Sequence, residues 1–171
     1  MEGPMYGTYA ADQVADTIWA LTTAGVPNAL VQHPYLQTLP RYCISLANPN
    51  DFVTPCFGDG GPARGPMGRL LLTLALRGDT EAAWYCREAG LLEATSVRTF
   101  ILLDPRRIRP ETPTFNPSAA FVDTGYAVLR DGYKRGTAFM AFKAGPPTAS
   151  IGHNHYDHNS FVINYAGEWL A

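Results

Sequence analysis

Three of the four histidines of this chain lie in one stretch, Gly152-His153-Asn154-His155-Tyr156-Asp157-His158-Asn159-Ser160-Phe161. If its backbone is extended, His153, His155 and Asp157 line one face, because side chains alternate along a strand. Imidazole and carboxylate groups on one face suit zinc or a similar divalent ion. Residues 161–165 then have the apolar pattern of a strand. The stretch therefore predicts a polar site beside a sheet; the alternative is an exposed polar loop with chance histidines.

Short strands are predicted on both sides of the histidine stretch. Apolar and aromatic runs are separated by turn residues, and Asp131-Gly132 and Ala166-Gly167 have the composition of hairpin turns. At most five short strands fit here, which gives a sheet with an open edge. Because the last run stops abruptly, we expect the chain to be a piece of a longer polypeptide. The predicted strands are residues 121–123, 126–130, 137–143, 160–165 and 168–170.

The first half of the chain has helical patterns instead. Val14, Ile18 and Leu21 recur at helical spacing, and this pattern ends near Gly25. A turn-rich segment, 52–62, is too long to be only a connector. Further helices are predicted over 35–46, with Pro40 in the first turn, over 64–77, and over 80–90, with Asp79 or Thr80 as the N-cap.

A segment rich in proline and arginine separates the two patterns. Pro105, Pro110, Pro113 and Pro117 interrupt any regular element, and arginines lie between them. Solvated arginines are the preferred interpretation, and a surface for an anionic ligand is the alternative. We predict a helical part over 1–90, a linker over 91–118 and a β part over 119–171.

Composition excludes several classes of protein. The 171 residues carry 13 Lys+Arg and 15 Asp+Glu, a formal net charge of −2, which does not favour binding to nucleic acid. The apolar run 69–76 is about half the ~18 residues that a membrane span needs, so we expect no membrane partner. Cys43, Cys56 and Cys86 have no metal-ligand spacing and are interpreted as buried thiols. One disulfide in an oxidising compartment stays open as an alternative.

The histidine stretch resembles the motif of the heparinase II/III-like polysaccharide lyases, which runs into a strand pair ending in Gly-Glu, here Gly167-Glu168. Residues 121–130 look like the first strands of the β-sandwich of that family. Residues 2–10, with Tyr6, resemble the helix start that carries its catalytic tyrosine, and Phe57-Gly58-Asp59 matches a shared loop. The resemblance implies an α+β multidomain piece: the C-terminal part of an (α/α) toroid followed by the first strands of an antiparallel β-sandwich.

The activity that this resemblance implies is β-elimination on a uronic-acid-containing polysaccharide. The proton on C5 lies next to an anionic carboxylate, so the site must neutralise that carboxylate and hold a base against C5. By match to the motif, Tyr6 is the base and then the acid, with Tyr9 as the fallback. His153 would contact the uronate carboxylate or assist the proton transfer.

The same resemblance implies a structural zinc ion. His155 would be a zinc ligand, and Asp157 would orient a histidine. A structural zinc site needs about four ligands, so the site is incomplete in this chain. Asp59 is a possible cleft residue, whereas His158 and His33 are interpreted as structural or loop residues.

We expect an anionic polysaccharide or oligosaccharide as the substrate, a periplasmic or secreted parent enzyme, and no activity of the isolated chain. Two alternatives stay open. His-x-His-x-Asp-His is also the metal motif of metallo-β-lactamase-like hydrolases, although there it opens a turn into a helix. The other alternative is a non-catalytic carbohydrate-binding β-sandwich. The sequence leaves the identity of the polysaccharide and the oligomeric state open.

Overall fold

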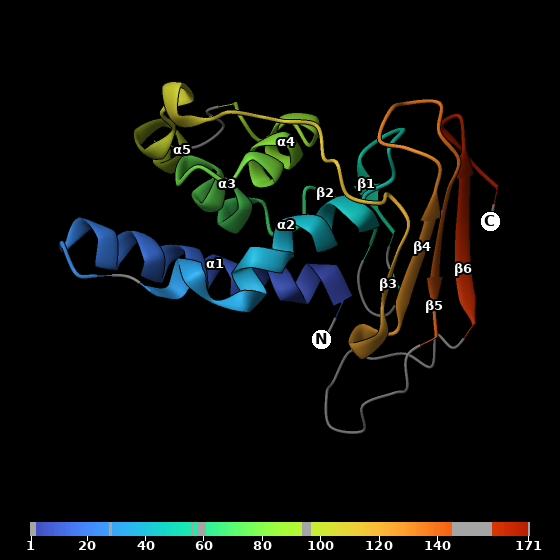
Figure 1. Cartoon of the computed structure of the whole chain (residues 1–171), viewed down its shortest axis with the longest axis horizontal. Helices are drawn as coiled ribbons and strands as arrows, with labels where there is room; N and C mark the ends of the chain where they lie inside the picture. The colour runs from blue at the N-terminus through green and yellow to red at the C-terminus, as the bar shows by residue number, and fades with distance from the viewer. Residues whose placement is uncertain are drawn as a thin grey trace. The chain divides into compact units, whose positions relative to one another are not determined.

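The computed structural model describes residues 3–27, 29–55, 57, 61–93, 97–144 and 159–170, and Figure 1 shows their helices and strands. The chain divides into two compact units. The sheet unit comprises Met1–Gly7, Ser45–Pro66 and Thr114–Ala171, and the helical unit comprises Thr8–Ile44 and Met67–Pro113. Each unit is thus assembled from segments far apart in the sequence. The domain boundaries predicted at residues 90 and 118 stay predictions.

The helical unit has a closed apolar interior. Leu70 and Leu71 are buried completely, as are Tyr85 and Cys86. Asp79 lies just before α4, and its Oδ1 accepts a hydrogen bond of 2.8 Å from the backbone N–H of Ala82, as expected for an N-cap. The helices are α1 (Gly3–Thr23), η1 (Ala29–Gln32), α2 (Pro34–Leu46), α3 (Gly68–Leu76), α4 (Thr80–Glu88), α5 (Val97–Leu102) and η2 (Pro105–Arg107), with the first residues of α1 and the last of α2 counted in the sheet unit.

The sheet unit contains an antiparallel meander in which each strand pairs with the next, in the order β3-β4-β5-β6-β7. Val128, Ala141 and Val162 are cross-strand neighbours at its centre. A two-stranded sheet, β1-β2, lies in the same unit. The elements are β1 (Val53–Thr54), β2 (Ala63–Arg64), β3 (Ala119–Phe121), η3 (Val122–Thr124), β4 (Tyr126–Arg130), β5 (Phe139–Lys143), β6 (Ser160–Tyr165) and β7 (Glu168–Trp169).

Two of the helix predictions need correction, and one helix was not predicted. α3 begins at Gly68 rather than at residue 64, because Ala63 and Arg64 pair with β1 as strand β2. Pro40 lies in the interior of α2, and Pro34 takes the first helical position, where its missing N–H is tolerated. Helix α5 lies inside the range predicted as a linker.

The strand predictions are confirmed for β4 and β6, whose bounds are as expected. The prediction of a strand over residues 121–123 is wrong, because β3 ends at Phe121 and the short helix η3 follows. Asp131-Gly132 is not a two-residue turn, because residues 131–138 connect β4 to β5. Ala166-Gly167 is confirmed as a hairpin turn, with φ of 51° and 96° at the two positions, as a type I′ turn requires.

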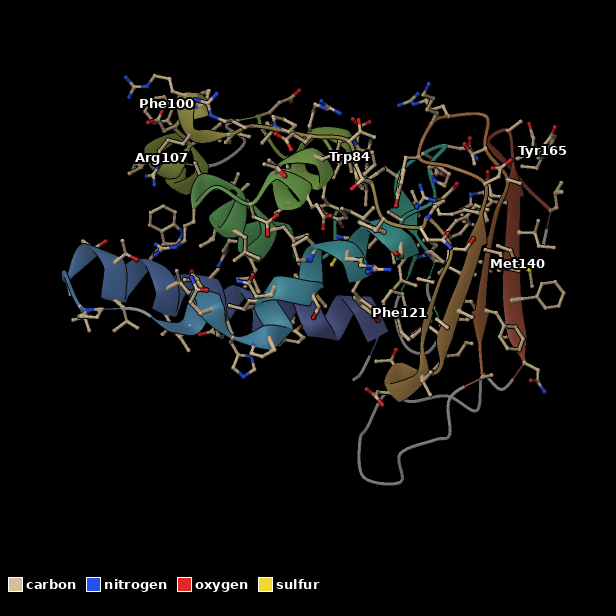
Figure 2. The ribbon with its side chains drawn as sticks, in the orientation of Figure 1. Trp84, Phe100, Arg107, Phe121, Met140 and Tyr165 are labelled. Atoms are coloured by element: carbon tan, nitrogen blue, oxygen red, sulfur yellow. The ribbon has the colours of Figure 1, made fainter. Side chains whose placement is uncertain are left out.

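The two faces of the meander differ. On the first, here called the closed face, Val128, Phe139 and Ala141 are buried, together with the polar residues Arg130 and Asn164. The second, here called the open face, is apolar and exposed; Figure 2 labels two of its residues. Leu129, Phe161 and Tyr165 are 61%, 48% and 59% exposed there. Register places Ala127, Leu129, Met140, Phe142, Phe161, Ile163 and Tyr165 on the open face.

Among the described residues, no helix combines the length and the apolar character required to cross a bilayer.

Candidate functional site

Most of the predicted site residues lie outside the described residues. This holds for His153, His155, Asp157 and His158 in the connection between β5 and β6, and for Asp59 in the segment after Phe57. The roles assigned to them therefore stay predictions.

The two tyrosines of α1 fall into different units. The backbone of Tyr6 lies in the first turns of α1, within the sheet unit, and its side chain is outside the described residues. Tyr9 belongs to the helical unit and is 78% exposed. The backbone of Tyr6 and the strands that flank the histidine stretch thus belong to one compact unit.

The stem of the histidine-bearing connection is a regular antiparallel strand pair. Lys143, at the end of β5, is the register partner of Ser160, at the start of β6. The backbone N–H of Ala144 donates to the carbonyl of Gly125 over 2.8 Å. The histidine stretch therefore leads directly into a strand, as predicted, and not into the helix that follows the metallo-β-lactamase motif.

A cation and two aromatic rings lie beside this stem. Lys143 Nζ donates to the carbonyl of Thr124 over 2.8 Å and lies 4.7 Å from the ring centroid of Tyr126. The rings of Tyr126 and Phe57 are 5.8 Å apart and tilted by 57°. Phe57 is two residues before Asp59 in the sequence. The structure therefore brings the segment that leads to Asp59 and the stem of the histidine connection to the same end of the sheet.

Sequence analysis missed a polar network on the closed face, centred on Asn50. Its Nδ2 donates to Asn164 Oδ1 over 2.7 Å and to the carbonyl of Thr137 over 3.0 Å. Its Oδ1 accepts from the backbone N–H of Gly136 over 2.7 Å. We call these contacts the Asn50 network. The cluster Asn48-Pro49-Asn50-Asp51 was its only signal, and such clusters ordinarily indicate a turn.

Asp51 and Arg130 also connect segment 47–53 to the sheet. Asp51 Oδ2 accepts from Trp169 Nε1 over 3.2 Å. Arg130 Nη1 donates to the carbonyl of Ala47 over 3.0 Å, and its Nε donates to the carbonyl of Gly132 over 2.8 Å. Burial lowers the pKa of Arg130 to about 10, against the raising effects of Tyr133 and Asp131. The guanidinium stays protonated at neutral pH, so a charged group fixes this segment.

Comparison with known protein families finds a match for the region that contains the histidine stretch. Residues 113–171 match the family model described as heparinase II/III-like, C-terminal. This part of the chain is similar to the C-terminal region of the heparinase II/III-like proteins. The match covers about a third of the chain and includes the meander, the Ala166-Gly167 turn and the whole β5–β6 connection of the heparinase II/III-like region.

Solved structures extend the likeness in fold to the whole chain. Heparan sulfate lyase HepC from Pedobacter heparinus matches with a TM-score of 0.72 and 19% identity, over 98% of this chain and 24% of its own. A heparinase III gene product matches with a TM-score of 0.64 and 17% identity, again over 98% and 24%. The chain thus spans about a quarter of the length of these proteins. No curated protein matches the chain.

The fold expected from the resemblance is confirmed. The chain combines helices with antiparallel sheets, and the C-terminal domain of its structural neighbours is a β-sandwich. At identities under 20%, these neighbours show the fold of the chain and not its activity.

Proposed function

We propose that this chain is part of a polysaccharide lyase that cleaves a uronate-containing polysaccharide by β-elimination. The observation that carries this proposal is the heparinase II/III-like match over residues 113–171, which contain the histidine stretch. The direct passage of that stretch into β6 supports the lyase over a metallo-β-lactamase-like hydrolase. The likeness in fold to a heparan sulfate lyase supports an anionic polysaccharide as the substrate.

In the proposed reaction, one phenol acts twice. Tyr6, as the phenolate, takes the proton from C5 of the uronate, and the electron pair expels the O4 leaving group as the C4–C5 double bond forms. The resulting phenol then donates its proton to O4. A nearby cation lowers the pKa of a tyrosine from its usual value near ~10 and makes the phenolate accessible. His153 contacts the uronate carboxylate or assists the proton transfer.

A structural zinc ion belongs to the proposal but not to the reaction steps. Of the described residues, no three His, Cys, Asp or Glu side chains form a group suited to a metal. His155 is the ligand we propose from this chain, with Asp157 orienting a histidine. Because a structural zinc ion takes about four ligands, His155 would share the ion with further ligands. A polymer substrate supports a periplasmic or secreted parent enzyme.

Two tyrosines three residues apart provide a matched test. In the full-length polypeptide, Tyr6→Phe should reduce the appearance of unsaturated uronate, followed by ultraviolet absorbance, by about 10²–10⁴-fold. Tyr9→Phe removes the same hydroxyl from the exposed position and should leave turnover within about twofold. Zinc content, measured by atomic absorption, should be equal in both variants. Normal turnover of the Tyr6 variant would remove Tyr6 from the mechanism.

The same assays separate the alternatives. A metal hydrolase would cleave the polymer without producing unsaturated uronate. A carbohydrate-binding β-sandwich would bind the polysaccharide equally well after Tyr6→Phe and His153→Ala, and would show no turnover before either substitution. Loss of unsaturated product in both variants, with zinc retained, is the result we expect.

A further inference from the structure

Helix α5 and the turn of η2 carry an exposed surface that the proposed lyase site does not use. Val97, Phe100 and Ile101 are 77%, 74% and 72% exposed. Arg107, the last residue of η2, and Arg109, two residues further on, are also exposed. Figure 2 labels Phe100 and Arg107. We call these five residues the α5–η2 surface.

The apolar residues of this surface lie on one side of a helix. Val97, Phe100 and Ile101 have the spacing i, i+3, i+4, which places side chains together on a helix face. The helical unit buries Trp84 and Tyr85 almost completely, so its interior accommodates large aromatic side chains. Val97, Phe100 and Ile101 therefore form an exposed apolar patch, and such patches commonly mark a binding surface.

The surface also concentrates positive charge. Residues 97–111 contain four arginines and two acidic residues, in a chain whose net charge is −2. Asp104 is already engaged by Arg106, with Nε to Oδ1 at 2.9 Å and Nη2 to Oδ2 at 3.2 Å. Arg107 also interacts electrostatically with Asp104, but the four arginines outnumber the two acidic residues, so the segment keeps a net positive charge.

We propose that the α5–η2 surface, which contains none of the proposed catalytic residues, binds an acidic polysaccharide chain. A phenyl ring offers a flat apolar face to the C–H face of a pyranose, and guanidinium groups pair with carboxylate or sulfate in a forked geometry. Charge complementarity selects this ligand over a neutral glycan or an apolar protein surface. The choice of polysaccharide rests on the proposed function.

The test measures binding and turnover separately in the full-length polypeptide. Heparin and polygalacturonate are the probes, carrying sulfate with carboxylate and carboxylate alone, and dextran is the neutral control. A double variant with Arg107→Gln and Arg109→Gln is compared with a control double variant. The control carries Arg87→Gln and Arg135→Gln, which remove two exposed charges elsewhere. Affinity is measured by calorimetry over a range of salt concentrations.

The Arg107/Arg109 variant should bind heparin about tenfold more weakly, with a smaller salt dependence, whereas the Arg87/Arg135 variant should bind within about twofold. Phe100→Ser should weaken binding without changing the salt dependence. A parallel loss for polygalacturonate assigns the surface to carboxylates, and a loss for heparin alone assigns it to sulfates. Turnover of a short oligosaccharide should be unchanged in every variant.

Equal binding by both arginine variants would overturn the proposal, as would binding of dextran. Self-association that Phe100→Ser abolishes, without an effect on polysaccharide binding, would instead identify a protein interface and overturn it too. Failure of the proposed function has a different signature. In that case no unsaturated uronate appears with any variant, while the binding difference between the arginine variants persists.

Discussion

The closed and open faces of the meander are built from alternate residues of the same strands, yet they are completed differently. On the closed face, Val128 is buried and Arg130 and Asn50 place their polar atoms against partners. On the open face, Leu129 and Phe161 keep about half or more of their surface exposed. Strand alternation decides which residues share a face, but only segments distant in sequence complete it. A second sheet, as in a β-sandwich, is the layer that the open face lacks within the described residues.

Substitution of Arg130 should have the largest effect, because it leaves buried carbonyl groups without a donor. Arg130→Met keeps much of the side-chain volume but removes the hydrogen bonds to Ala47 and Gly132. We expect the free energy of unfolding to fall by about 3 kcal/mol, measured by urea denaturation. Arg130→Lys restores one charged donor and should lose less. A loss under about 0.5 kcal/mol would show that the closed face does not depend on this residue.

Asn50→Ala should rank second. It removes the bonds to Asn164, Thr137 and Gly136 but leaves no uncompensated charge. The expected loss is about 2 kcal/mol in the same measurement. Asn116→Ala is the control, since the Asn116 side chain makes its hydrogen bond in an exposed turn. Equal losses at the two positions would remove the distinction between a closed-face network and an ordinary turn.

The two buried thiols of the helical unit, Cys43 and Cys86, allow a comparison between a fully buried interior and the closed face of the sheet. Burial is the main cause that raises the pKa of the Cys86 thiol from 9.0 to about 12, and the negative charge of Asp79 raises it further. Burial also raises the pKa of the Cys43 thiol. An unfolded thiol loses its proton near pH 9 while the folded one keeps it. Stability is therefore complete below pH 9 and falls as the pH rises toward 12, by at most about 1.4 kcal/mol per pH unit for each thiol.

The measurement is the urea midpoint between pH 8 and 10.5, with Cys86→Ala as the comparison. The variant should lose less stability over this range than the unsubstituted protein. Identical pH dependence in the two proteins would mean that Cys86 ionises equally in the folded and unfolded states.

The smallest effect is expected on the open face. In this chain, Leu129→Thr should change the free energy of unfolding by about 0.5 kcal/mol or less, whereas Val128→Thr on the closed face should lose about 2 kcal/mol. In the full-length polypeptide, the Leu129 substitution should become as costly as the Val128 substitution if a second layer covers the open face. An unchanged small effect there would show that the open face stays exposed.

Local signals predicted the elements that depend on neighbours in sequence. Asp79 caps α4 through a bond three residues away, and Ala166-Gly167 forms a turn between adjacent strands. The predictions failed where distant segments decide the structure. Pairing with β1 makes Ala63 and Arg64 a strand, although the apolar pattern that follows them is helical.

The residues of the candidate site also differ in whether the sequence alone predicts them. The density of histidines singled out residues 153–158 without any structural information, and the family match then included them. The Asn50 network was not predictable, because Asn164 is more than a hundred residues from Asn50 and neither residue type indicates a partner. Its members have ordinary turn and strand contexts, and only the folded chain joins them.

The register of Lys143 with Ser160 has a consequence for the diversity of these proteins. A loop whose two ends are fixed at neighbouring positions loses little stability when it lengthens, since doubling its length costs only about 0.6 kcal/mol. Insertions and deletions between these two residues should therefore be tolerated by the sheet. The strand pair β5–β6 should therefore keep its register when the number of residues between Lys143 and Ser160 changes.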